Sequence, residues 1–202
     1  MEEIGLFPLD IVLVPGERLP LHIFEDRYRE LIAECLENST EFGLIFRQGV
    51  ALSGVGTRAE VHDVLRRYPD GRLDIVVVGG NRFRLVEETE GRSFLTARVD
   101  DVEDLDDPPS PEELAACMDA FARIVALVGD DVPAPDVAAS PSFGIAARLG
   151  LPAELRQELL EMLSERDRVL RLTEALDGPV TTQLRARQIE QRAAGNGKVD
   201  HL

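Results

Sequence analysis

Few residues of this 202-residue chain are spaced for chemistry. His22 stands three positions before Glu25, and His62 stands beside Asp63, so each pair could supply two ligands to a metal ion. Structural zinc sites usually need four ligands, and no further ligand converges on either pair in the sequence. We therefore expect no metal, and we expect His22 to pack or to hydrogen-bond locally.

Three side chains could act as nucleophiles: Ser53, Cys35 and Cys117. Ser53 lacks the Gly-x-Ser-x-Gly turn of an α/β-hydrolase, and its closeness to His62 in sequence does not predict the geometry of a triad. Both cysteines fall on the apolar stripes of predicted helices, where cysteine behaves as a small hydrophobe. The one lysine, Lys198, lies near the C-terminus, which argues against Schiff-base chemistry and a Ser–Lys dyad. We expect no catalytic residue and no cofactor.

Composition excludes further classes of function. The chain carries 38 acidic and 22 basic residues, for a net charge of −16, which repels phosphate backbones and anionic membranes. The Met-Glu-Glu start lacks the positive charge of a secretory signal, and the longest uncharged run, residues 137–147, is too short to span a bilayer. These features, with two isolated cysteines, predict a cytoplasmic protein that binds neither nucleic acid nor membrane.

The first hundred residues are typical of β-structure. Alternating or β-branched runs predict short strands at 11–14, 55–62, 73–78, 82–88 and 94–99. Pro69-Asp70-Gly71 predicts a hairpin turn after Tyr68, and Gly79-Gly80-Asn81 predicts a second turn. Apolar residues at helical spacing predict one crossover helix over 24–36. The sequence thus predicts a small β-barrel or β-sheet domain over residues 1–100.

The second half changes to helical periodicity. Residues 101–112 belong to an acidic, proline-rich segment with little apolar surface to bury, so we expect an exposed linker. The segment lacks the glycine and the glutamate of a calcium-binding loop, which argues against calcium binding. Apolar stripes over 113–178 predict a helical bundle, and 179–202 are expected to be a flexible tail. The overall class is therefore α+β.

Several motifs resemble the Lon protease N-terminal domain family. They are Leu6-Phe7-Pro8-Leu9, Val14-Pro15-Gly16, Leu19-Pro20-Leu21-His22-Ile23-Phe24-Glu25-Asp26-Arg27-Tyr28, Gly56-Thr57-Arg58-Ala59-Glu60-Val61, Pro69-Asp70-Gly71-Arg72, Gly79-x-x-Arg82-Phe83, Phe143-x-x-Ala146-x-x-Leu149 and Gln157-x-Leu159-Leu160-Glu161. The resemblance implies a PUA-like β-domain followed by a helical bundle. In full-length Lon proteases this domain recognises unfolded or tagged substrates and supports hexamer assembly, and an ATPase and a Ser–Lys peptidase follow it.

No Gly-x-x-x-x-Gly-Lys-[Ser/Thr] motif occurs in the chain. The resemblance therefore implies a noncatalytic, stand-alone recognition module, acting in protein quality control or as a protease-associated adaptor. Its expected partner is an unfolded or extended polypeptide, or a partner protein, while the oligomeric state is left open. The alternative is a small-molecule pocket in the β-domain, although the chain has no Trp and two Tyr from which to build an aromatic cage.

Six side chains are candidates for contact with a polypeptide: Phe7, Leu9, Phe24, Tyr28, Arg82 and Arg84. Arg82 and Arg84 flank Phe83, so on a strand they share one face and form either a docking patch or internal salt bridges. We favour a structural role in which Arg82 pairs with Glu25 or Asp26. The remaining signature residues are expected to shape turns, edges and the start of the helix: Pro8, Pro15, Gly16, Pro20, Leu21, Glu25 and Arg27.

Overall fold

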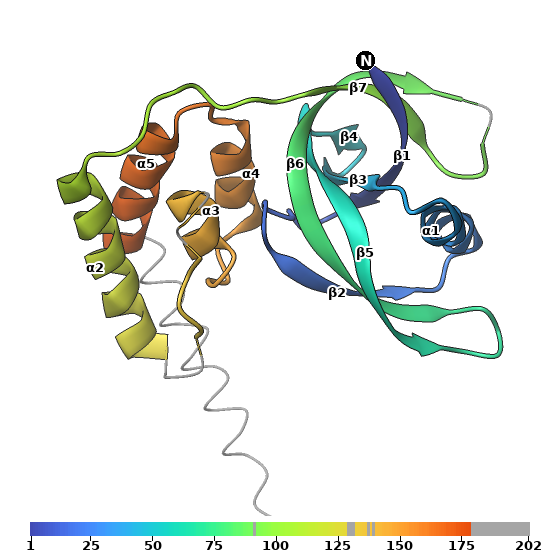
Figure 1. Cartoon of the computed structure of the whole chain (residues 1–202), viewed down its shortest axis with the longest axis horizontal. Coiled ribbons are helices and arrows are strands. Elements are labelled where there is room, and N and C mark those ends of the chain that lie inside the picture. The colour runs from blue at the N-terminus through green and yellow to red at the C-terminus, as the bar shows by residue number, and fades with distance from the viewer. Residues whose placement is uncertain (91, 129–131, 137, 139, 179–202) are drawn as a thin grey trace, which may run out of the picture. The chain divides into compact units, whose positions relative to one another are not determined.

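The computed structural model describes residues 1–90, 92–128, 132–136, 138 and 140–178. The predicted tail, residues 179–202, lies outside this part of the chain. Two compact units are present (Figure 1): a β-unit of Met1–Asp104 with Ala153–Leu163, and a helical unit of Leu105–Pro152 with the segment that begins at Ser164. No helix among the described residues is long and apolar enough to cross a bilayer.

The described part of the β-unit contains one seven-stranded sheet. Its strands are β1 (Glu2–Leu9), β2 (Arg18–Ile23), β3 (Phe42–Gln48), β4 (Ala51–Leu52), β5 (Val55–Arg67), β6 (Leu73–Thr89) and β7 (Thr96–Asp101). The order across the sheet is β1-β7-β6-β5-β3-β4, and β2 pairs with β6. These neighbours pair antiparallel, while β1 also pairs with β3 in parallel.

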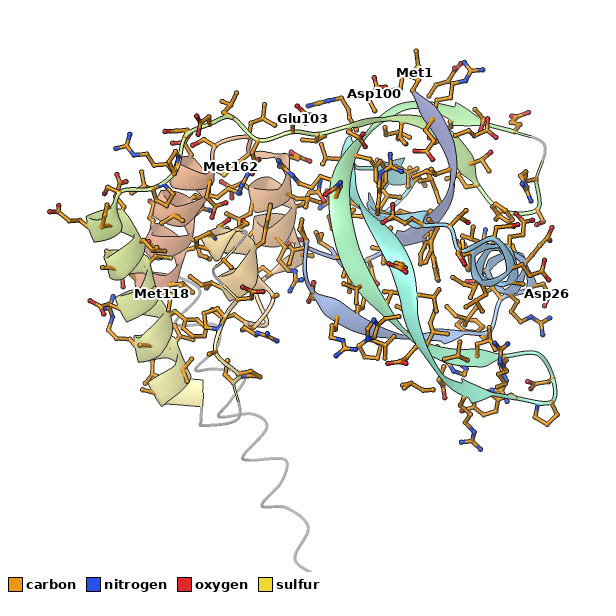
Figure 2. All side chains as sticks on the ribbon, in the orientation of Figure 1. Met1, Asp26, Asp100, Glu103, Met118 and Met162 are labelled. Atoms are coloured by element: carbon orange, nitrogen blue, oxygen red, sulfur yellow. The ribbon has the colours of Figure 1, made fainter. Side chains whose placement is uncertain are left out.

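Strand β1 connects two parts of this sheet. Residues 2–5 pair with β7, and residues 6–9 pair with β3, so the sheet curves back on itself through the two halves of one strand. At the outer end of β1, the N-terminal amine lies 3.2 Å from Oδ1 of Asp100 (Figure 2). The expected α+β class is confirmed, and its β-part is a curved sheet instead of a regular closed barrel.

The longest strands, β5 and β6, form the predicted hairpin and run side by side in Figure 1. The turn predicted at Gly79-Gly80-Asn81 is wrong, because β6 continues through it. A register shift between Thr57 and Ala59 places a bulge there. Gly79 instead allows close approach, since a Cβ on it would lie 2.3 Å from the carbonyl oxygen of Val14. Residues 11–14, predicted as a strand, form no strand and are mostly buried.

Helix α1 (Asp26–Asn38) fills the concave side of the sheet. The chain enters it at Glu25, whose carbonyl accepts hydrogen bonds from the backbone N–H groups of residues 28 and 29. Tyr28, Leu31, Ile32 and Cys35 are buried in a core shared with strands β1, β2, β3, β5 and β6. Burying each large apolar side chain contributes roughly 1.5–3 kcal/mol, so this stripe anchors the helix.

Helix α4 (Ala153–Glu161) belongs to the β-unit. Arg156 donates from Nε to the carbonyl of Val12 at 3.0 Å and forms an ion pair with Glu17, while Gln157 donates from Nε2 to the carbonyl of Val55 at 3.1 Å. These polar side chains are buried, so the helix is held by hydrogen bonds to backbone far away in sequence. The bundle predicted over 113–178 is therefore interrupted by a helix that packs on the sheet.

The helical unit consists of α2 (Pro111–Val128), α3 (Pro141–Ala146) and α5 (Glu165–Asp177) among its described residues. Arg168 is fully buried in it, where its guanidinium contacts Ser142 and Glu165 and lies 4.5 Å from the ring centroid of Phe143. α2 and α5 also carry an exposed pair, in which Arg166 donates from Nη2 to Glu113 at 2.8 Å. The Arg166–Glu113 pair thus joins α5 to α2, and hydrogen bonds from Ser142 to Glu165 and from Arg168 to Ser142 join α3 to α5.

Candidate functional site

Three aromatic rings gather on the surface of the β-unit, where β2 ends and the β5–β6 hairpin turns. We call His22, Phe24 and Tyr68 the aromatic platform. In the hairpin turn, the N–H of Tyr68 donates to the carbonyl of Arg72 at 2.9 Å. Gly71 has a φ of +88°, which glycine adopts without steric cost. The predicted Pro-Asp-Gly turn is thereby confirmed, and it fixes Tyr68 at the end of β5.

The rings of the platform contact one another at ordinary aromatic distances. The His22 ring centroid lies 6.0 Å from that of Phe24, nearly parallel to it, and 5.9 Å from that of Tyr68, edge to face. The guanidinium carbons of Arg66 and Arg72 lie 4.5 Å and 4.9 Å from the Tyr68 centroid. Phe24 is 60% exposed, which is unusual for a large apolar ring. The surface offers aromatic faces beside cations, the residue types that dominate protein-binding hot spots.

A carboxylate holds two of the three rings in place. Nδ1 of His22 lies 2.5 Å from Oδ1 of Asp74, and the hydroxyl of Tyr68 donates to Oδ2 at 2.8 Å. Hydrogen bonds from His22 and Tyr68 lower the pKa of Asp74 below its usual range. His22 packs locally against Phe24, as expected, whereas its hydrogen-bond partner lies 52 residues away in sequence.

The four apolar candidates for polypeptide contact lie in two different environments. Phe7 and Tyr28 are buried and stack with ring centroids 4.0 Å apart, and Leu9 is half-buried against the same core. Only Phe24 among the four presents most of its ring to the surface. The structure therefore leaves Phe24 as the apolar candidate that a polypeptide could reach without rearrangement of the core.

Arg82 and Arg84 also lie in different environments. Arg82 is 4% exposed, and its Nη1 donates to the carbonyls of Leu160 and Met162 at 2.8 Å and 2.7 Å. It also forms an ion pair with Asp104. Arg84 is exposed on the same strand. Arg82 therefore holds the C-terminal end of α4 on the sheet.

The expected pairing of Arg82 with Glu25 or Asp26 is wrong. Glu25 instead contacts Arg27, which donates from Nη2 at 2.7 Å, and Asp26 forms an ion pair with Arg29. Both pairs lie at the start of α1, where the helix dipole favours acidic side chains. The helix is thus fixed to the sheet by its apolar stripe and not by Arg82.

The signature prolines and Gly16 lie in the sheet and its turns. Pro8 is buried in β1 opposite Ile45, and Pro20 lies on β2, which pairs with β6. Proline cannot donate to a ladder, so Pro20 blunts an edge that would otherwise invite pairing. The Pro15-Gly16 turn has a positive φ of 77° at the glycine, whose N–H donates to the carbonyl of Gly79 at 2.8 Å. Leu21 on β2 packs against the main core.

Two hollows of the β-unit are lined by described residues. A cavity of about 420 Å³ lies beside α1, and its lining includes two arginines that each bind a carboxylate of the same lining: Arg58 with Glu2, and Arg92 with Glu34. An open groove of about 500 Å³ lies beside α4. We call it the α4 groove; it is lined by Phe46, Gln48, Ser53, Glu154, Gln157, Glu158, Glu161 and Met162.

The residues first considered for chemistry are not gathered into a site. Within the described residues, no three histidine, cysteine or acidic side chains converge to hold a metal ion. His62 and Asp63 form an exposed pair 3.7 Å apart. Burial raises the pKa of the thiols of Cys35 and Cys117, which disfavours the reactive thiolate.

Comparison with known proteins identifies the fold. A family model for the substrate-binding domain of the ATP-dependent protease La (Lon) matches residues 3–178. The chain belongs to the Lon substrate-binding domain family. Lon protease from Paraburkholderia phytofirmans is 24% identical over 96% of this chain, and that from Anaeromyxobacter dehalogenans is 27% identical over 89%. The chain spans 26% and 25% of these two relatives, about a quarter of their length.

Solved structures of the Lon family share the fold. A Lon N-terminal domain protein from Xanthomonas campestris has a TM-score of 0.70 and 27% identity, covering 86% of this chain and 98% of that one. The N-terminal domain of Lon protease from the Mycobacterium avium complex has a TM-score of 0.65 at 16% identity, covering 87% and 98%. The resemblance inferred from the signature motifs is confirmed.

Reasoning from the sequence missed several residues in and around the aromatic platform of this Lon-family domain. Tyr68, Asp74, Arg66 and Arg72 were not among the candidates for contact with a polypeptide, because each is an ordinary residue of a strand or turn. The sequence did hold one signal: Tyr68 stands close to arginines on both sides of the Pro69-Asp70-Gly71 turn. Their contact with His22 depends on the β2–β6 pairing, which a single sequence does not specify.

Proposed function

We propose that the β-unit binds extended segments of polypeptide on the aromatic platform and catalyses no reaction itself. The observation that carries the proposal is the exposure of Phe24. This ring lies in the family's signature segment, yet it is 60% exposed, whereas Ile23 and Tyr28 of the same segment are buried. Covering an exposed ring with a partner is favourable, because the ring leaves water. The neighbouring arginines can bind acidic or carbonyl groups of the bound polypeptide.

The family supports polypeptide as the ligand class, since its model describes the substrate-binding part of Lon. An unfolded segment loses conformational entropy on binding, so a small platform gives modest affinity and tolerates many sequences. These properties suit a module that presents substrates to a protease or takes part in protein quality control. The cytoplasmic location remains a prediction from the sequence.

The alternative ligand, a small molecule, would occupy the cavity beside α1. The arginines that line this cavity are engaged with carboxylates of the same lining, so fewer charged groups remain to orient a ligand. Polypeptide binding on the platform is therefore the function that we propose.

The test is the affinity of the whole chain for an unfolded protein such as reduced, alkylated casein, measured by fluorescence anisotropy. We expect Phe24→Ala to weaken binding at least about tenfold, because covering a phenylalanine side chain is worth roughly 1.5–3 kcal/mol. Val86→Ala is the matched control, since Val86 is also an exposed apolar residue of the β-unit. Equal loss in both variants, or no binding by the wild-type chain, would contradict the proposal.

A further inference from the structure

Arg66 lies in one row with two polar residues across three neighbouring strands. Strands β2, β6 and β5 are adjacent (Figure 1), and their register places His22 opposite Asp74 and Asp74 opposite Arg66. Directly opposed residues point to the same face of a sheet, so Arg66 shares the face that carries the aromatic platform. The next residue, Arg67, opposes buried Leu73 and therefore points to the other face.

The exposed guanidinium of Arg66 differs from its neighbours in having no ion-pair partner among the described residues. Its carbon lies 4.5 Å from the ring centroid of Tyr68. The acid opposite it, Asp74, instead uses one oxygen for His22 and the other for Tyr68. Other arginines of β2, the start of α1 and the hairpin turn have carboxylate partners: Arg18 with Asp63, Arg27 with Glu25, and Arg72 with Asp70. The N–H groups of Arg66 can therefore receive a carboxylate from another chain.

The charge of the whole chain makes this arrangement informative. At a net charge of −16, the chain does not attract acidic polypeptides over long distances. A preference for an acidic group would thus require direct contact with a cation. The guanidinium fork of arginine matches both oxygens of a carboxylate, and here it lies beside aromatic rings that suit an apolar side chain.

We propose that the aromatic platform selects extended segments in which an acidic residue stands two positions from an aromatic or large apolar residue. The apolar side chain covers the rings of Phe24 and His22, and the carboxylate binds Arg66 beside Tyr68. In an extended chain, side chains two positions apart point the same way and lie about 6.5 Å apart. The ring centroids of His22 and Tyr68 are separated by a similar distance, 5.9 Å. This inference rests on the proposed function and adds to it the chemistry of the preferred segment.

The first experiment compares three short labelled peptides that differ only in the two residues after a central phenylalanine: Ser-Asp, Ser-Asn and Asp-Ser. By fluorescence anisotropy, we expect the whole chain to bind the Ser-Asp peptide about fivefold more tightly than the Ser-Asn peptide, the upper end for an exposed charge pair. The Asp-Ser peptide has the same composition, but its carboxylate points away from Arg66, so its affinity should be close to that of the Ser-Asn peptide.

Two arginine variants and one platform variant separate the local contact from total charge. R66Q should lower the affinity for the Ser-Asp peptide to that for the Ser-Asn peptide. R67Q is the matched control, because it removes the same charge from the adjacent residue on the other face and should leave the fivefold preference intact. Phe24→Ala should weaken all three peptides by equal factors.

The failures of the inference and of the proposed function are distinguishable. If the wild type binds all three peptides equally, or if R66Q and R67Q reduce the preference equally, the inference is wrong while polypeptide binding stands. Equal binding of the Ser-Asp and Asp-Ser peptides would also contradict it, because the position of the acid would then be irrelevant. If no peptide binds, the proposed function fails and the inference with it.

A second measurement observes Arg66 directly. In the nuclear magnetic resonance spectrum of the whole chain, the side-chain Nε–H signal of Arg66 should shift on addition of the unlabelled Ser-Asp peptide and not on addition of the Ser-Asn peptide. Absence of this difference at saturating peptide would overturn the inference. Displacement of the Ser-Asp peptide by inorganic phosphate at equal concentration would also overturn it, because Arg66 would then belong to a site for free anions.

Discussion

Replacing Arg82 by methionine should loosen α4 from the sheet of the β-unit. The methionine side chain keeps much of the packing but removes the donors to the carbonyls of Leu160 and Met162 and the ion pair with Asp104. A hydrogen bond from a charged donor contributes about 1.5–3 kcal/mol, so the two carbonyl bonds alone set a range of about 3–6 kcal/mol. Met162 is partly exposed and water can replace one donor, which places the expected loss near about 3 kcal/mol.

The assay is urea unfolding together with hydrogen exchange of residues 153–163. For a urea slope of about 2 kcal/mol per molar, a loss of about 3 kcal/mol lowers the midpoint by about 1.5 M. The same loss, expressed as local opening of α4, accelerates exchange of its amides by about 150-fold. Arg84→Met is the matched control, because Arg84 is exposed on the same strand and should change stability by less than about 0.5 kcal/mol.

The result that would refute this reasoning is a loss below about 1 kcal/mol for Arg82→Met, or equal losses for both arginines. A double-mutant cycle with Asp104→Asn distinguishes the contributions of the two kinds of partner. If the carbonyls dominate, Asp104→Asn alone should be mild and the double variant should resemble Arg82→Met. If the ion pair dominates, each single variant should be as unstable as the double one.

Three further outcomes follow from the structure. Gly79→Ala should lower the free energy of unfolding by at least about 2 kcal/mol in urea titrations, whereas Gly54→Ala, where a Cβ meets nothing within 4 Å, should be nearly neutral; equal effects would contradict the close approach. Glu113 has its pKa lowered to about 2 by hydrogen bonds from its arginine partner, so its stabilisation is full above pH 4.5 and lost as the pH falls toward 2. The melting temperatures of wild type and Glu113→Gln should therefore converge over that range, and a constant gap would refute the assignment. Cys35 and Cys117 should react with iodoacetamide much more slowly in the native chain than in denaturant, as mass spectrometry would show; equal rates would contradict their burial.

Local pattern was sufficient for the parts of the fold that depend on neighbouring residues. The stripe of Tyr28, Leu31 and Cys35 predicted α1, and Pro69-Asp70-Gly71 predicted the hairpin, because helical spacing and turn dihedrals are properties of short segments. The extent of β6 was missed because the glycines at 79 and 80 signal turns and bulges equally well.

Contacts between distant segments were beyond the sequence. Arg156 and Gln157 lie on a helix whose periodicity suits a bundle, and nothing local shows that their partners are the backbone carbonyls of Val12, between β1 and β2, and of Val55 on β5. The platform has the same origin, since His22 meets Tyr68 and Asp74 only after β2 pairs with β6. Phe24 and Phe7 were both named as candidates, but the sequence did not show that Phe24 is exposed and Phe7 is buried.

The acidic segment shows how such long-range pairing changes the meaning of composition. Residues 101–120 carry eight acids and no base, and the sequence predicted that 101–112 form a solvated linker. In the structure, Asp101 pairs with the largely buried Arg58 at 2.9 Å, and Asp104 pairs with buried Arg82. A buried guanidinium needs acceptors on several sides, and arginine satisfies this geometry better than lysine. Asp101 and Asp104 of this segment therefore neutralise arginines that the fold buries. In a chain with a single lysine, these buried cations are arginines, which suit such positions better.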